Sequence, residues 1–168
     1  MHVELNELLR SSNSSLKEIT NVIYIAGPGF YTGLRLAYGI ADIMRISGAR
    51  LFGFYAFDIP HLLGVENYQW ITKAYRGEVF VFTRNETSTS INLLSDREFQ
   101  EKDWQPSSYI HHTSALDDAM RAKLVDPIAT QGLLATQMSA ICSQVVASGV
   151  QKELFYFRPA EEEFKPNP

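Results

Sequence analysis

The segment YIAGPGFYTGLRLAYGIADIM, residues 24–44, constrains the fold more than any other part of the chain. An apolar run from Val22 to Ala26, rich in β-branched residues, is typical of a strand that is buried on both faces. Gly27-Pro28-Gly29 ends this run, and a helix is predicted from Tyr31 to Ser47. Leu51 to Tyr55 is the next predicted strand. A strand, a helix and a strand in this order predict a right-handed crossover between two parallel strands.

The rest of the chain predicts antiparallel strands and further helices. A hairpin is expected from Tyr68 to Tyr75 and Glu78 to Thr83, because Gly77 can supply the positive φ that a tight turn needs. A long helix is predicted from Thr130 to Ser148, followed by an extended aromatic stretch. Shorter elements are expected, namely helices over 2–10, 57–63 and 96–104 and strands over 90–94 and 109–112. The fold class is therefore α/β, with one parallel crossover and an antiparallel meander.

Composition excludes several classes of protein. The 168 residues carry a net charge of −4 and no cluster of basic residues, so the chain is not expected to grip nucleic acid by itself. Cys142 is the single cysteine, which rules out an internal disulfide. Neither a secretory signal nor an apolar run of membrane-spanning length is found, so we expect a cytoplasmic protein.

The glycine-rich loop does not match the standard nucleotide-binding motifs. Leu34-Arg35 follows Gly33 where a Walker loop needs Lys and then Ser or Thr, and Thr32 occupies the third glycine position of the Rossmann fingerprint. Two interpretations remain: an anion site at the helix N-terminus, or glycines that allow close packing of helix on sheet. The histidines form no pair at helical spacing, so neither a metal site nor a catalytic group is predicted.

The helix after the loop is apolar on two sides. Leu36, Ile40 and Ile43 form one face, and a second face holds Leu34, Ala37, Tyr38 and Ala41. A helix with two apolar faces needs two covers, and one of them is this chain's own sheet. The other cover is either a partner protein or the rest of this domain.

Four segments resemble the TsaB (YeaZ) family. GPGFYTGLRLAYGIADIM resembles its GPGSFTGLR-type motif, and AYRGEVFVF, residues 74–82, resembles its ARRGEVY-type hairpin. ELFYFRPAEE, residues 153–162, is similar to its C-terminal segment, and MHVELNELL is similar to the helix that begins with His-Ser-Glu in members of the family. These segments follow the family's order over nearly the whole chain.

The resemblance implies an actin-like ATPase fold (ASKHA, ribonuclease H-like) and a scaffold without catalysis of its own. Members of the family bind and activate their paralogue TsaD, which forms threonylcarbamoyladenosine next to the anticodon of tRNA; TsaE joins that complex. Alone, they form homodimers. The resemblance therefore implies TsaD and TsaE as partners, tRNA contact only through the complex, and no resident cofactor or metal. It leaves open a nucleotide at the partner interface.

The resemblance also assigns residues and regions. The loop motif comprises Gly27, Pro28, Gly29, Thr32, Gly33 and Arg35, and Arg35 is expected to pair with a partner carboxylate. The expected partner interface comprises Val3, Leu5, Leu9, Leu34, Ala37, Tyr38, Ala41 and Arg45. We expect an N-terminal lobe over residues 1–65, a C-terminal lobe over 66–158 and a flexible tail over 159–168.

The sequence departs from the family pattern in three respects, one of which is Lys73, which stands before the hairpin where an Asp is common in the family. Phe30-Tyr31 replaces the usual Ser-Phe in the loop. The family's first strands have no counterpart before the first predicted helix, which would leave the strand from Val22 to Ala26 near an open sheet edge. Two other classes of function therefore stay open: an enzyme of the same superfold, resembling a metalloprotease or a kinase, and a homodimeric interaction module unrelated to tRNA.

Overall fold

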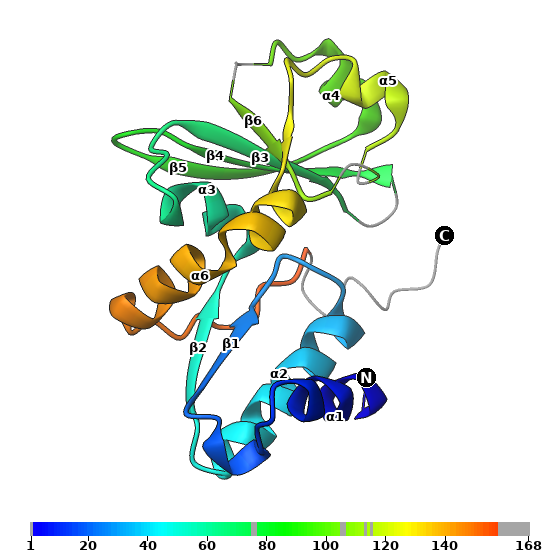
Figure 1. The fold of residues 1–168 in the computed structure, drawn as a ribbon. Helices are drawn as coiled ribbons and strands as arrows, with labels where there is room; N and C mark the ends of the chain where they lie inside the picture. Colours follow the sequence, from blue (N-terminus) through cyan, green and yellow to red (C-terminus); the bar gives the residue numbers. More distant parts are fainter. Residues whose placement is uncertain (1, 75–76, 105–106, 113, 115, 158–168) are drawn as a thin grey trace.

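Two sheets and the helices around them make up the fold (Figure 1). The structure, a computed structural model, describes residues 2–74, 77–104, 107–112, 114 and 116–157, with the backbone alone for residues 2–5. A two-stranded parallel sheet lies at one end of the molecule and a five-stranded mixed sheet at the other (Figure 1). The mixed α/β class predicted from the sequence is confirmed.

The two-stranded sheet contains the predicted crossover. Its elements are α1 (His2–Ser11), η1 (Leu16–Glu18), β1 (Asn21–Ile25), α2 (Tyr31–Ile46) and β2 (Arg50–Phe54). β1 and β2 pair in parallel, with Ile23 opposite Phe52, and α2 packs mainly on β1. Among the described residues, the second edge of β1 has no partner strand.

The five-stranded sheet has the order β5-β4-β3-β6-β7. β3 (Tyr68–Lys73), β4 (Val79–Arg84) and β5 (Thr89–Leu94) form the antiparallel meander that the sequence predicts, although two residues of the hairpin turn, 75–76, lie outside the described part. β6 (Ser108–Ile110) joins β3 in parallel, and β7 (Ile128–Ala129) joins β6 in parallel. The prediction of a single parallel crossover is therefore wrong.

Alternation of side chains divides the core of this sheet into two layers. On one face, Ile71, Val81 and Ile110 pack against α4 (Asp96–Glu101) and α5 (Asp118–Arg121). On the other face, aromatic side chains contact η2 (Ala56–Asp58), which leads into α3 (Ile59–Leu62). This aromatic layer comprises Phe57, Tyr68, Trp70, Phe80, Phe82 and Tyr109.

α6 (Thr130–Ser148) connects the two sheets, and its outer bounds are those predicted from the sequence, but a kink at Gln137 (φ −120°, ψ 17°) divides it into two helical parts. At its first residue, the buried Thr130 hydroxyl accepts a hydrogen bond from Trp70 Nε1 at 3.2 Å. Farther along, Ile141 and Val145 pack in one cluster with Phe52 of β2. The segment after α6 then runs along β2, where the Gly53 N–H donates to the Val150 carbonyl at 3.2 Å. The division into lobes stays a prediction, and the expected tail, 159–168, lies outside the described residues.

Candidate functional site

The glycine loop approaches the chain's own C-terminal segment. Gly27 has a φ of +130°, and a Cβ atom there would lie 2.2 Å from the Phe155 carbonyl oxygen. The Phe155 N–H donates to the Ala26 carbonyl at 2.8 Å, and the Ala56 N–H donates to the Gly27 carbonyl at 2.7 Å. Glycine is therefore required at this position by both backbone conformation and space.

Aromatic side chains of the same segment cover the loop. Gly29 pairs with Tyr156 in an isolated parallel bridge, and the Phe30 and Phe157 rings are 5.9 Å apart. The Tyr31 and Tyr156 rings are 5.0 Å apart. These contacts support the packing interpretation of the loop.

The remaining loop-motif residues differ in burial. Pro28 is half-buried, whereas Thr32 and Gly33 are exposed in the first turn of α2. A Cβ atom at Gly33 would meet no atom within 4 Å, so local packing does not require glycine there.

Arg35 is held from two directions. Its Nε donates to the Tyr156 hydroxyl at 3.3 Å, and its guanidinium lies 4.6 Å from the Tyr31 ring centroid. The hydrogen bond to Tyr156 raises the pKa of Arg35 above its ordinary value. Arg35 forms no ion pair with any described residue, so its pairing with a partner carboxylate stays a prediction.

One side of α2 packs on this chain's own strand. Tyr38 contacts Tyr24 edge to face at a ring separation of 5.5 Å, and Ala41, 2% exposed, lies in the same cluster. Met44 is also buried. Ala41 therefore faces this chain's own strand, where its small side chain lets the helix approach β1 closely, and its place in a partner interface stays a prediction.

The opposite side of α2 is apolar and exposed. Leu36, Ile43 and Ile46 are 57%, 63% and 76% exposed. Their spacing of seven and three residues places them along one side of the helix. We call these three residues the outer stripe. The sequence pattern predicts an apolar face that includes Leu36 and Ile43, but the expected partner interface does not contain them.

The other predicted interface residues have mixed environments. Leu9 and Leu34 are half-buried, and Ala37 is exposed. Arg45 is exposed and bonds Asp42 at 2.7 Å, which raises the pKa of Arg45. The side chains of Val3 and Leu5 lie outside the described residues.

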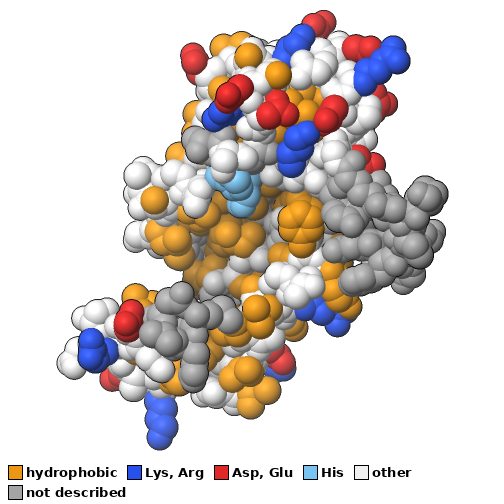
Figure 2. Space-filling model, turned by 90° about the vertical axis from the view of Figure 1, so that its right-hand side faces the viewer, with side chains coloured by type: hydrophobic (Ala, Val, Ile, Leu, Met, Phe, Trp, Pro, Cys, Tyr) orange, Lys and Arg blue, Asp and Glu red, His pale blue; other side chains and the backbone are white. Residues whose placement is uncertain are grey.

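Hydrophobic side chains also gather on a neighbouring surface. Figure 2 shows them across the middle of one face, at the level of α6, between a charged upper part and the level of α1 and α2 below.

Within the described residues, no group of His, Cys, Asp or Glu is arranged to hold a metal ion. Among helices in that part of the chain, none combines the length and the apolar character that a membrane span requires.

Comparison with known proteins gives matches in structure alone. No protein-family model and no curated protein matches the chain. YeaZ from Pseudomonas aeruginosa is similar at 14% identity, over 88% of this chain and 80% of that one, with a TM-score of 0.47. An uncharacterized protein with similarity to peptidase YeaZ from Pseudomonas aeruginosa is similar at 14% identity, over 89% of this chain and 80% of that one, with a TM-score of 0.49.

Proposed function

We propose that this protein is a non-catalytic, TsaB-like scaffold of actin-like fold that binds and activates TsaD in the formation of threonylcarbamoyladenosine in tRNA. The observation that carries the proposal is the outer stripe of α2. The helix that bears the family-like TGLR motif buries Ala41 and Met44 on its own strand and leaves Leu36, Ile43 and Ile46 exposed.

The stripe has the character of an association surface. Isolated apolar residues on a surface are ordinary, but the outer stripe places three large ones along one side of a single helix. A partner helix laid along the stripe would bury them, and Arg35 and Arg45 are exposed on the same helix for contacts at the rim. TsaD is the proposed occupant because the loop and helix sequence resembles the family that pairs with it.

The free energy that the outer stripe contributes to association follows from the exposed fraction of its side chains. Complete burial of an isoleucine side chain contributes about 1.5–3 kcal/mol, so burying the exposed 63% of Ile43 contributes about 1–2 kcal/mol. Ile43→Asp removes this contribution and also places a charge in an apolar contact, so we expect the affinity for TsaD to fall at least about tenfold.

The test is light scattering coupled to size-exclusion chromatography, on this chain alone and with TsaD from the same organism. A one-to-one complex is expected, together with threonylcarbamoylation of tRNA that depends on this chain in a reconstituted reaction. Ile91→Asp on β5 is the matched control, since Ile91 is 45% exposed on the other sheet. The absence of a complex with TsaD would refute the proposal, and so would equal affinity of the two variants for TsaD. A homodimer that does not bind TsaD would favour an interaction module unrelated to tRNA.

A further inference from the structure

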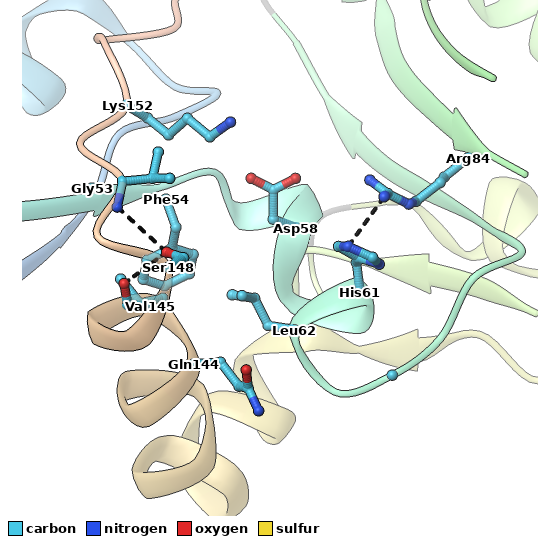
Figure 3. Close-up of a pocket in the computed structure, with 12 residues that line it drawn as sticks. Gly53, Phe54, Asp58, His61, Leu62, Arg84, Gln144, Val145, Ser148 and Lys152 are labelled. Atoms are coloured by element: carbon cyan, nitrogen blue, oxygen red, sulfur yellow. Dashed lines mark hydrogen bonds between the residues drawn. The ribbon is translucent and has the colours of Figure 1, made fainter. Parts of the chain in front are cut away.

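A pocket of about 570 Å³ opens between the two sheets, away from the proposed interface. Its walls come from β2, α3, the end of β4, the last turns of α6 and the segment that follows α6 (Figure 3). None of its lining residues belongs to α1, α2 or the glycine loop. Its volume is in the range of pockets that hold small molecules.

Charged side chains converge on this pocket from distant parts of the sequence. Figure 3 shows Asp58 between Lys152 on one side and Arg84 on the other. The carboxylate of Asp58 accepts a hydrogen bond from the Tyr55 N–H at 3.2 Å. Burial raises the pKa of Asp58, while the positive charges of Lys152 and Arg84 oppose that rise.

His61 holds Arg84 without neutralising it. The Arg84 Nη2 atom lies 3.1 Å from His61 Nε2, and because a guanidinium can only donate, this ring nitrogen is the acceptor. The other ring nitrogen, Nδ1, is 3.6 Å from Glu66 Oε2. The guanidinium is therefore oriented by an imidazole nitrogen instead of a carboxylate.

The pocket consequently has an excess of positive charge. Neither Arg84 nor Lys152 forms an ion pair with a described residue; the Lys152 ammonium lies 5.4 Å from the Tyr55 ring centroid instead. Two permanent cations thus face one half-buried carboxylate. Cations that are desolvated in part and lack a carboxylate partner are stabilised by an anionic ligand.

Apolar and polar walls complete the site. Phe54, Leu62 and Val145 supply apolar surface, and Gln144 supplies an amide. The Ser148 hydroxyl donates to the Val145 carbonyl at 2.8 Å and accepts from the Val150 N–H at 3.4 Å, so its oxygen can accept one further hydrogen bond. A ligand that carries both an anionic group and hydroxyls matches this mixture.

We propose that this pocket binds a small organic anion, a polyhydroxylated carboxylate or phosphate ester. Arg84 and Lys152 attract the anionic group, and Asp58 accepts a hydrogen bond from a ligand hydroxyl. The bound molecule contacts both sheets at once, and it stabilises the fold by an amount that rises with the logarithm of ligand concentration above the dissociation constant. This inference is independent of the proposed role with TsaD.

Isothermal titration calorimetry of the whole chain at low salt tests the proposal with three probes. Citrate represents the carboxylates, glucose 6-phosphate the phosphate esters, and glucose is the neutral comparison. We expect saturable binding, at one site per chain, of at least one anion and none of glucose. If only one anion binds, its class identifies the ligand chemistry. If neither anion binds, the proposal is overturned.

Variants show whether binding takes place in this pocket. Arg84→Met is expected to raise the dissociation constant at least about tenfold, the usual effect of losing a charge-assisted hydrogen bond. Arg97→Met is the matched control, because Arg97 pairs with Glu101 on the exposed surface of α4 and should leave binding unchanged. If Arg84→Met does not fold, as judged by circular dichroism, Lys152→Met must show the same loss. Equal affinity of the pocket and control variants would place the anion elsewhere and refute the assignment.

Discussion

Substitution of Gly27 by alanine should destabilise the fold far more than the loss of one hydrogen atom suggests. At a φ of +130°, an L-residue is strained by about 1–3 kcal/mol. The new Cβ would also lie 2.2 Å from the Phe155 carbonyl oxygen, so the loop and the C-terminal segment must separate. Displacement of the loop weakens both backbone bonds that hold it, the 2.8 Å bond from the Phe155 N–H to Ala26 and the 2.7 Å bond from the Ala56 N–H to Gly27, each worth about 0.5–1.5 kcal/mol.

The expected loss is therefore about 2–6 kcal/mol of unfolding free energy, a large part of the total stability of a domain. Urea unfolding followed by circular dichroism measures it as a lower midpoint at an unchanged slope. Gly33→Ala is the matched control in the same motif: no atom lies within 4 Å of its Cβ position, and alanine is the better helix former by up to about 1 kcal/mol. If Gly27→Ala unfolded at the wild-type midpoint, the packing explanation of the loop would be wrong.

Three further predictions concern residues whose environments differ sharply. Ala41→Glu should unfold the protein instead of selectively breaking association, because Ala41 is 2% exposed against Tyr24; a monomeric but fully folded variant, by circular dichroism and light scattering, would contradict this. Phe57→Ala should cost about 3–5 kcal/mol in urea unfolding, since Phe57 stacks on Phe82 at 4.2 Å and is buried; a cost below about 1 kcal/mol would mean that the aromatic layer is not a packed core. Asp58→Asn should raise the melting temperature at pH 7, because the raised pKa of Asp58 means that its ionised form destabilises the fold above that pKa. The gain should vanish as the pH falls below about 4, where Asp58 is protonated in the folded and unfolded states. A gain that does not depend on pH would refute the explanation.

Long periodic elements could be predicted from the sequence, whereas short pairings could not. The apolar positions of α6 and the glycine after it predicted its two ends, although not the kink at Gln137, and the crossover through α2 followed from the strand and helix signals. β7 has two residues and α5 has four, which are too few for a strand or helix periodicity to be detected in the sequence. Their place is set by tertiary pairing with β6 and by packing over the sheet.

The two faces of α2 illustrate a different limit. Both were recognised as apolar, but Ala41 was assigned to a partner and Leu36 and Ile43 were not. The structure places the small residue against β1 because helix and sheet can approach closely there, and the bulky residues remain outside. Periodicity shows that two faces exist and does not tell which one the chain itself covers.

The pocket could not have been found by a motif. Its four charged or titratable groups, Asp58, His61, Arg84 and Lys152, come from η2, α3, β4 and the segment after α6. These residues meet only because the two sheets and α6 pack together, and the spacing of the residues in the sequence does not predict that packing.

The return of residues 150–157 to β2 and the glycine loop has a consequence for how the protein folds. Tyr24, near the start of the chain, donates its hydroxyl to the Lys152 carbonyl at 2.7 Å, across 128 residues. The two-stranded sheet therefore cannot complete its hydrogen bonds on the ribosome until nearly the whole described chain has been synthesised. Contacts between such distant residues slow folding, because a long loop must close before they contribute. The pairing of β1 with β2, which joins residues 21–25 to 50–54, can form locally, and the contacts with residues 150–157 are expected to join it later.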